Sequence, residues 1–153
     1  MHYILGASGA GKSALVAHLS AVLPERTILD WDSLMEAAGR LAGRDVRTNA
    51  GLWQPYAELM RDVVGLLPAD RVILLTVCTP DQLMDWPEGA WFLLECDDAE
   101  RRKRLESRGE PSAVIETALA DAQDYRDLGL ARIETTNVPL EMVARQLAEA
   151  IGA

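Results

Sequence analysis

The sequence has few cysteines and no long apolar run. Its two cysteines, Cys78 and Cys96, each end an apolar segment, at 72–78 and 91–96. We expect free, buried thiols in a reducing compartment, although the two segment ends could also lie near one another. No segment approaches the roughly 20 apolar residues that span a bilayer, and too few residues precede the glycine-rich loop at residue 6 for a signal peptide. We therefore expect a cytoplasmic protein that does not cross a membrane.

Positive charge is also scarce, and lysine is the scarcest basic residue. Fifteen Lys and Arg against 24 Asp and Glu give a net charge of −9. Such a surface should repel nucleic acid and anionic lipid over most of its area, but it does not exclude small ligands in a local pocket. Only Lys12 and Lys103 are lysines, and Lys12 lies inside the glycine-rich loop. This position suggests a site that needs a compact ammonium group.

Strand-like and helix-like segments alternate along residues 1–153 without a repeat or a linker, which predicts a single domain. The predicted strands are 2–5, 27–32, 71–77, 91–96 and 131–136. The predicted helices are 12–23, 33–42, 50–67, 97–109, 112–128 and 139–151. This order predicts an α/β fold with three αβα layers and a mainly parallel five-stranded sheet. Ligands bind such sheets beyond the carboxyl ends of the strands.

Residues 6–13 read GASGAGKS and fit the pattern G-x-x-x-x-G-K-[ST], between a predicted strand and a predicted helix. Backbone N–H groups can converge on a polyphosphate only where bulky side chains are absent. Lys12 would reach the terminal phosphates of ATP, and Ser13 would bind Mg²⁺. The alternative is a glycine turn in which Ser13 caps the helix. The expected nucleotide contacts of the loop are Gly6, Ala7, Ser8, Gly9, Ala10, Gly11, Lys12, Ser13 and Ala14.

The loop and the order of elements resemble the P-loop kinases of the nucleoside-monophosphate-kinase-like group, among them adenylate-kinase-like and chloramphenicol-phosphotransferase-like enzymes. This resemblance extends over essentially the whole chain. It implies a fold of the P-loop NTPase type. It also implies transfer of the γ-phosphoryl group of ATP, with Mg²⁺, to a small hydroxyl or phosphate acceptor such as a nucleotide, a metabolite or an antibiotic-like molecule.

Two aspartates, Asp30 and Asp32, end the second predicted strand. Phosphoryl transfer needs one carboxylate to take or position the hydroxyl proton and another to help hold the metal. The stretch DSLMEA at 32–37 is similar to the same region of chloramphenicol phosphotransferase, which implies that Asp32 is the base. Asp30 and Asp32 would both lie on the substrate side of the site, and either Asp30 or Asp32 supports Mg²⁺ beside Ser13, or the metal relies mostly on Ser13, phosphates and water. The alternative is a capping box formed by residues 33–36. The third predicted strand ends without an acid, unlike that of many P-loop enzymes.

Three arginines, Arg101, Arg104 and Arg108, follow i, i+3, i+7 spacing on one face of a predicted helix. By resemblance, residues 97–111 form a lid whose arginines close over the phosphates. Arg104 and Arg108 would then take part in transfer, and Arg101 would bind the nucleotide. The alternative is a solvated helix with i, i+4 ion pairs. The candidate pairs are Asp97–Arg101, Asp98–Arg102 and Glu100–Arg104.

The region between the second and third strands encloses the acceptor in the resembled group. Here it holds Arg40, Arg44 and Arg47, which would suit an acceptor that carries phosphate or carboxylate. Trp53 or Tyr56 could stack on a ring, although half-buried structural aromatics explain them equally well.

Late in the chain, Asn137 follows Thr135 and Thr136 and could border the adenine, unless these residues only form a turn before the last helix. The leading hypothesis is therefore an ATP-dependent kinase, either a monomer or a homodimer. The alternative is a nucleotide-binding regulator or ATPase without a small-molecule acceptor.

Overall fold

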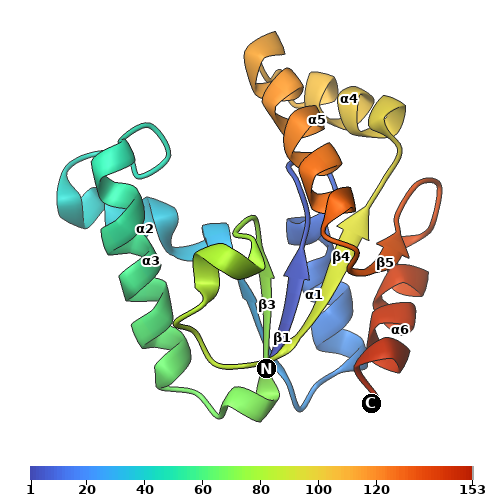
Figure 1. The fold of residues 1–153 in the computed structure, drawn as a ribbon, viewed down its shortest axis with the longest axis horizontal. Helices are drawn as coiled ribbons and strands as arrows, with labels where there is room; N and C mark the ends of the chain where they lie inside the picture. The colour runs from blue at the N-terminus through green and yellow to red at the C-terminus, as the bar shows by residue number, and fades with distance from the viewer. Residues whose placement is uncertain (153) are drawn as a thin grey trace.

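Five parallel strands form one sheet in the computed structural model, which describes residues 1–152 (Figure 1). The strands are β1 (His2–Leu5), β2 (Thr27–Asp30), β3 (Val72–Thr76), β4 (Ala90–Glu95) and β5 (Ala131–Glu134). Their spatial order is β2-β3-β1-β4-β5, and every neighbouring pair is parallel. The continuous apolar runs of β1 and β3 occupy the middle of the sheet, where both faces are covered.

Within residues 1–152 the chain forms six α-helices, which cover the faces of this sheet and extend beyond the carboxyl ends of its strands. They are α1 (Lys12–Val22), α2 (Met35–Ala42), α3 (Ala50–Gly65), α4 (Asp98–Ser107), α5 (Ser112–Asp127) and α6 (Leu140–Ile151). Three short 3₁₀ turns, η1 (Trp31–Leu34), η2 (Ala69–Arg71) and η3 (Pro80–Leu83), complete the connections. The predicted α/β fold with a parallel five-stranded sheet is confirmed.

The side chains of each central strand alternate between two apolar layers. Ile4 and Ile73 pack with α1 and α6 on one face, whereas Tyr3 and Leu74 pack with α2 and α3 on the other. Leu5 joins the part of the second layer that α5 covers. Burying one such side chain stabilises the fold by about 1.5–3 kcal/mol. The strand register therefore determines which helix covers which face.

Two pairs of helices extend beyond the carboxyl ends of the strands and flank the loop between β1 and α1 (Figure 1). One pair is α2 and α3, which follow β2, and the other is α4 and α5, which follow β4. Each pair follows directly from the carboxyl end of its strand, so residues that are distant in the sequence meet at this edge of the sheet.

The structure differs from several of the local predictions and agrees with another. The helix predicted at 33–42 begins with the 3₁₀ turn η1. Asp30 caps this turn, because its Oδ1 accepts a hydrogen bond from the N–H of Asp32 at 3.1 Å. Leu34, which precedes α2, makes no side-chain cap, so the capping box at 33–36 does not form. Cys78 and Cys96 are free and buried, as expected. The last strand ends at Glu134, two residues earlier than predicted.

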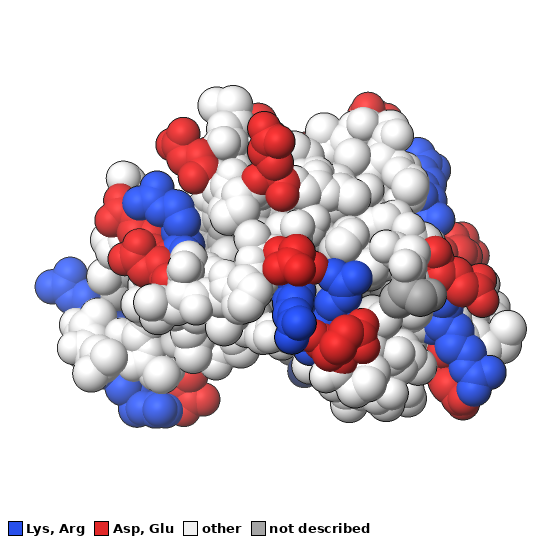
Figure 2. All heavy atoms as spheres, turned by 90° about the horizontal axis from the view of Figure 1, so that it is seen from below, with Lys and Arg blue, Asp and Glu red and all other residues white. Residues whose placement is uncertain are grey.

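The face at the amino ends of the strands carries intermingled charges. Figure 2 shows acidic and basic side chains next to one another on this face, rather than a field of basic ones, among the residues drawn in colour. Over residues 1–152, no helix is both long enough and apolar enough to cross a membrane.

Candidate active site

The loop at 6–11 turns the chain from β1 into α1. Its backbone takes left-handed conformations at Gly9 and Gly11, with φ of 83° and 103°, and side chains rarely tolerate that region. Gly11 precedes the first helical residue, and no side chain caps the helix there. Ser13 is exposed on the first turn instead. The N–H groups of this helix end and the Ser13 hydroxyl are therefore available to a ligand rather than engaged in a structural cap.

Lys12 is buried under this loop. Its Nζ donates to the carbonyl oxygens of Gly6 and Ala7, the latter at 3.3 Å. Burial lowers the pKa of Lys12 to about 8, while the carboxylates of Asp30 and Asp32 act in the opposite direction. Both aspartates therefore lie close enough to Lys12 to influence its pKa. This interaction connects the end of β2 electrostatically with the loop after β1.

The two aspartates have different surroundings. Asp30 is buried at the end of β2 and serves as the cap of η1. Asp32 is half-exposed, and its Oδ2 lies 3.8 Å from the guanidinium of Arg47. β3 ends in Thr76 and not in an acidic residue. The hydroxyl of Thr76 accepts a hydrogen bond from the N–H of Cys78 at 2.9 Å and thereby stabilises the turn after this strand.

Hydroxyl and carboxylate oxygens are the ligands that Mg²⁺ takes in proteins. Ser13, Asp30 and Asp32 are such donors at this edge of the sheet. Within residues 1–152, no group of three or more His, Cys, Asp or Glu side chains forms a metal site. The donor set therefore fits an ion that takes most of its ligands from phosphate and water.

Arg101 does not face the solvent. Its side chain is 0% exposed, and it forms a buried ion pair with Glu95 at 2.6 Å. Its Nη1 donates to the carbonyl of Ser8 in the phosphate loop at 2.9 Å. A Cβ at Gly9 would lie 3.0 Å from Arg101 Cγ, so the side chain passes directly beside the glycine. In this structure Arg101 lies behind the loop rather than in the cavity, because α4 packs against the loop and buries this position.

Arg104 also contacts the loop from outside. Its Nη1 donates to Gly9 O at 3.2 Å and its Nη2 to Thr135 O at 3.0 Å, while its Nε donates to Glu100 at 2.9 Å. Of the three i, i+4 pairs considered from the sequence, this one with Glu100 is present. Arg101 and Arg104 thus bind loop carbonyl groups, which leaves the opposite side of the loop, with its N–H groups, free to face a ligand.

A cavity of about 680 Å³ lies in front of the loop. Its first wall is the loop with Lys12 and Ser13, its second contains Asp32 and Arg47, and its third is the segment after α4 with Arg108. The remaining lining residues are Ser8, Gly9, Gly11, Thr48, Val77, Leu105, Glu110, Pro111 and Val114. The structure therefore brings together the phosphate loop, the predicted base and one of the predicted lid arginines.

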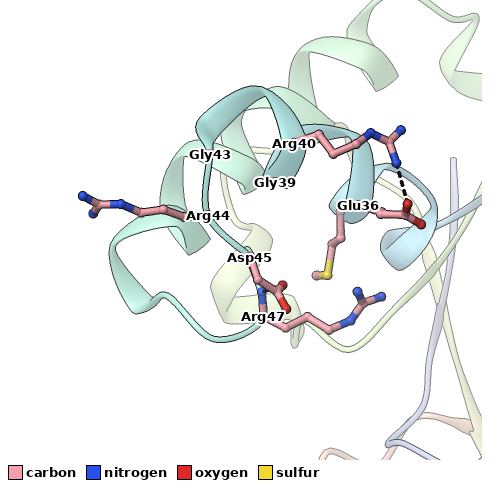
Figure 3. A pocket seen from close by; sticks show the side chains of 8 residues that line it. Glu36, Gly39, Arg40, Gly43, Arg44, Asp45 and Arg47 are labelled. Atoms are coloured by element: carbon pink, nitrogen blue, oxygen red, sulfur yellow. Dashed lines mark hydrogen bonds and ion pairs between the residues drawn. The ribbon is translucent and has the colours of Figure 1, made fainter.

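The other predicted acceptor residues lie elsewhere. Arg40 and Arg44 line a second pocket of about 400 Å³ against α2, in which Arg40 pairs with Glu36 (Figure 3). This pocket shares Arg47 with the cavity in front of the loop. Tyr56 is buried, donates to the carbonyl of Trp31, and has its pKa raised to about 12 by burial. Trp53 is 38% exposed and packs against Trp31 with ring centroids 5.8 Å apart. In this structure both aromatic side chains pack against Trp31, and neither lines the cavity in front of the loop.

The turn after β5 adjoins the phosphate loop. The hydroxyl of Thr135 donates to Ala10 O at 3.1 Å. Asn137, the predicted adenine neighbour, is exposed two residues later in a left-handed conformation, with φ of 55°. Sequence reasoning did not single out Thr48, Val77 or Val114. They are ordinary loop and helix residues, and only the folding of the chain brings them to the cavity.

Comparison with solved structures identifies the fold. The chain matches shikimate kinase from Acinetobacter baumannii in complex with shikimate, with a TM-score of 0.67 and 18% identity over 98% of this chain and 91% of that chain. A gluconokinase from Sinorhizobium meliloti matches with a TM-score of 0.67 and 17% identity over 98% and 90%. The chain has the fold of a P-loop small-molecule kinase.

This P-loop kinase fold also occurs in the tunicamycin resistance protein of Deinococcus radiodurans, with a TM-score of 0.71 and 19% identity over 98% of this chain and 94% of that chain. The sequence matches no protein-family model and no curated protein. The fold implied by the resemblance is thus shared with these solved structures over nearly the whole chain.

Proposed function

We propose that this protein is a kinase that transfers the γ-phosphoryl group of ATP to a hydroxyl group of a small molecule. One observation carries the proposal: Lys12 and Ser13 of the phosphate loop and the carboxylate of Asp32 line the same cavity. A donor phosphate on the loop and an acceptor hydroxyl at Asp32 would share this space. In-line transfer requires that arrangement.

The chain's own groups have separate roles in this reaction. The loop N–H groups and Lys12 bind the phosphates of ATP, and the ammonium group must exchange its loop carbonyl partners for phosphate oxygens. Asp32 accepts the proton of the attacking hydroxyl. Arg108, which follows α4, stabilises the charge on the transferring group. Mg²⁺, held by Ser13 with support from Asp30, would neutralise charge on the phosphates.

The solved structures with the same fold support a small acceptor. Two of them are kinases named for gluconate and shikimate, and the latter structure contains shikimate. A cavity of about 680 Å³ must hold the phosphates of ATP as well as the acceptor. It leaves room for a molecule of that size rather than for a polymer.

Acceptor-dependent release of ADP tests the proposal. Wild-type protein with ATP and Mg²⁺ would be screened against sugars, sugar acids, alcohols, nucleosides and nucleotides, and products would be detected directly by mass spectrometry. For an accepted compound, Asp32→Asn should lower kcat by about 10²- to 10⁴-fold while ATP still binds, because the variant loses only the proton acceptor. Lys12→Ala should instead weaken ATP binding.

One observation favours a nucleotide-binding regulator instead: β3 ends in Thr76 without a metal-supporting acid. The same screen decides between the two functions. Tight binding of ATP without acceleration by any compound would support the regulator and contradict the kinase.

A further inference from the structure

A second cavity, of about 260 Å³, adjoins the one in front of the loop. This α5 cavity lies between the phosphate loop and α5, which stands beside that loop in Figure 1. Ser8 and Val114 line both cavities. The other lining residues of the α5 cavity are Ala113, Thr117, Ala118 and Asp121. A ligand in front of the loop can therefore extend past Ser8 into the α5 cavity.

One face of α5 borders this cavity. Helical spacing places four residues on that face: Val114, Ala118, Asp121 and Tyr125. Tyr125 anchors the face to the end of β3, because its hydroxyl donates to the carbonyl oxygen of Val77 at 2.5 Å. Val77 itself lines the cavity in front of the loop. This hydrogen bond thus holds Asp121 beside the acceptor side of the site.

Asp121 is half-buried, and its carboxylate forms no ion pair with any of residues 1–152. Arg101, whose charge acts on Asp121, pairs with Glu95, and Arg126 on the same helix pairs with Glu95 as well. Burial and the carboxylate of Asp124 raise the pKa of Asp121, whereas Arg101 acts in the opposite direction. A cation beside Asp121 would therefore stabilise a carboxylate that the fold leaves without a partner.

The polar groups of the α5 cavity suit an ammonium group, which donates three hydrogen bonds and accepts none. The carboxylate of Asp121 and the hydroxyl oxygens of Ser8 and Thr117 are three acceptors. The Thr117 hydroxyl already donates to Ala113 O at 3.0 Å, so its oxygen can serve a ligand only as an acceptor. None of the residues that line this cavity is a lysine, arginine or histidine, and an anionic group would therefore have no charge partner in it.

Two of the three arginines that were predicted to suit an anionic acceptor already have carboxylate partners. Arg40 pairs with Glu36, and Arg47 lies beside Asp32. An anionic acceptor would have to replace these partners. A cationic acceptor would instead meet the Asp121 carboxylate, which has no ion-pair partner in the described part of the chain.

We infer that the acceptor is a small alcohol that also carries an ammonium group, and that Asp121 selects it by binding that group in the α5 cavity. This inference rests on the proposed kinase function. The acceptor oxygen forms a bond to the γ-phosphorus, the bond from that phosphorus to the ADP oxygen breaks, and the hydroxyl proton passes to Asp32. The ammonium group stays protonated throughout. The products are ADP and the phosphorylated amino alcohol.

Pairs of compounds that differ in one amino group test the inference: glycerol with 2-amino-1,3-propanediol, and glucose with glucosamine. Glycerate and gluconate are the anionic counterparts. At neutral pH, wild-type protein should prefer the amine of a pair over its neutral parent by about tenfold or more in kcat/KM. Asp121→Asn should lower kcat/KM for that amine by about ten- to hundredfold, mainly through KM, and should leave the neutral parent within about twofold, because only the charge is lost.

Asp124→Asn is the matched control, since it removes the same charge from an exposed side chain of α5 that lines neither cavity. It should retain the wild-type preference. Both variants should fold like wild type, which circular dichroism checks. The inference is overturned if Asp121→Asn keeps the preference for the amine, if both variants lose it equally, or if wild type prefers the neutral or the anionic compounds.

Failure of the kinase proposal itself would appear differently, as absence of ADP release with every compound. Calorimetry with a non-hydrolysable ATP analogue present then decides the inference. Binding of one of the two amines that Asp121→Asn abolishes and Asp124→Asn retains supports it, and the absence of such binding overturns it.

Discussion

Replacing Arg101 by methionine should destabilise the protein strongly, although the sequence places this residue on a highly charged helix. Its guanidinium binds Glu95 at 2.6 Å and the Ser8 carbonyl at 2.9 Å, and both charged side chains are buried. Methionine keeps most of the apolar stem but leaves the Glu95 carboxylate without its nearest charge partner. Removing one member of a buried ion pair typically costs about 3–5 kcal/mol.

One contact reduces this cost. Arg126 lies 3.3 Å from the same Glu95 oxygen and remains after the substitution. We therefore expect the lower end of the range, a loss of about 3 kcal/mol in the free energy of unfolding. Replacing Glu95 by glutamine in the same chain should recover part of that loss, because the uncompensated charge is then gone, and the two substitutions should couple by about 1–2 kcal/mol.

Urea denaturation of wild type, the two single variants and the double variant measures these free energies. Arg102→Met is the control on the neighbouring position. Its ion pair with Glu116 is 2.9 Å long but 43% and 63% exposed, so its loss should cost less than about 1 kcal/mol. ATP affinity of Arg101→Met, measured where the variant is folded, should also fall because the Ser8 carbonyl loses its donor. Equal stabilities of the Arg101 and Arg102 variants would refute the reasoning.

Three further predictions concern the same region. Because burial lowers the pKa of Lys12 to about 8, the ammonium group is lost as the pH rises through that value. ATP affinity should then decline, and calorimetry in buffers of different ionisation enthalpy should detect proton uptake on binding. Gly9→Ala should cost more stability than Gly109→Ala in thermal unfolding: both glycines have positive φ, but only the Cβ at Gly9 meets a neighbour, at 3.0 Å. Equal losses would show that φ alone matters. Tyr56→Phe should cost about 1 kcal/mol for the hydrogen bond to Trp31 without changing kcat for the accepted compound, and a loss of turnover would place Tyr56 in the site after all.

Features that depend on neighbours along the chain were predictable from the sequence. The apolar runs at 72–76 and 91–95 are long enough for strands and too continuous for a half-exposed sheet, so they indicate buried parallel strands. The segment GASGAGKS lies between a strand and a helix in the order that a phosphate loop requires. Asp30 and Asp32 follow the end of a strand, and the carboxyl ends of parallel strands lie at one edge.

The roles of the arginines were decided only by the tertiary structure. Helical spacing puts Arg101, Arg104 and Arg108 on one face of the helix predicted at 97–109, but it does not say what that face contacts. The first two bind the phosphate loop, and the third alone lines the cavity. Arg47 has no such spacing at all. It reaches the cavity because the turn before α3 directs it there.

The environment of the aromatic residues was likewise decided only by the tertiary structure. Tyr56 lies on α3, and its burial depends on Trp31, 25 residues earlier, which packs edge-on to it at the end of β2. Local sequence thus determined the strands, the phosphate loop and the positions of the acids. The packing of distant helices decided which charged side chains are buried as structural supports and which line the cavity in front of the loop, because burial is a property of the whole fold.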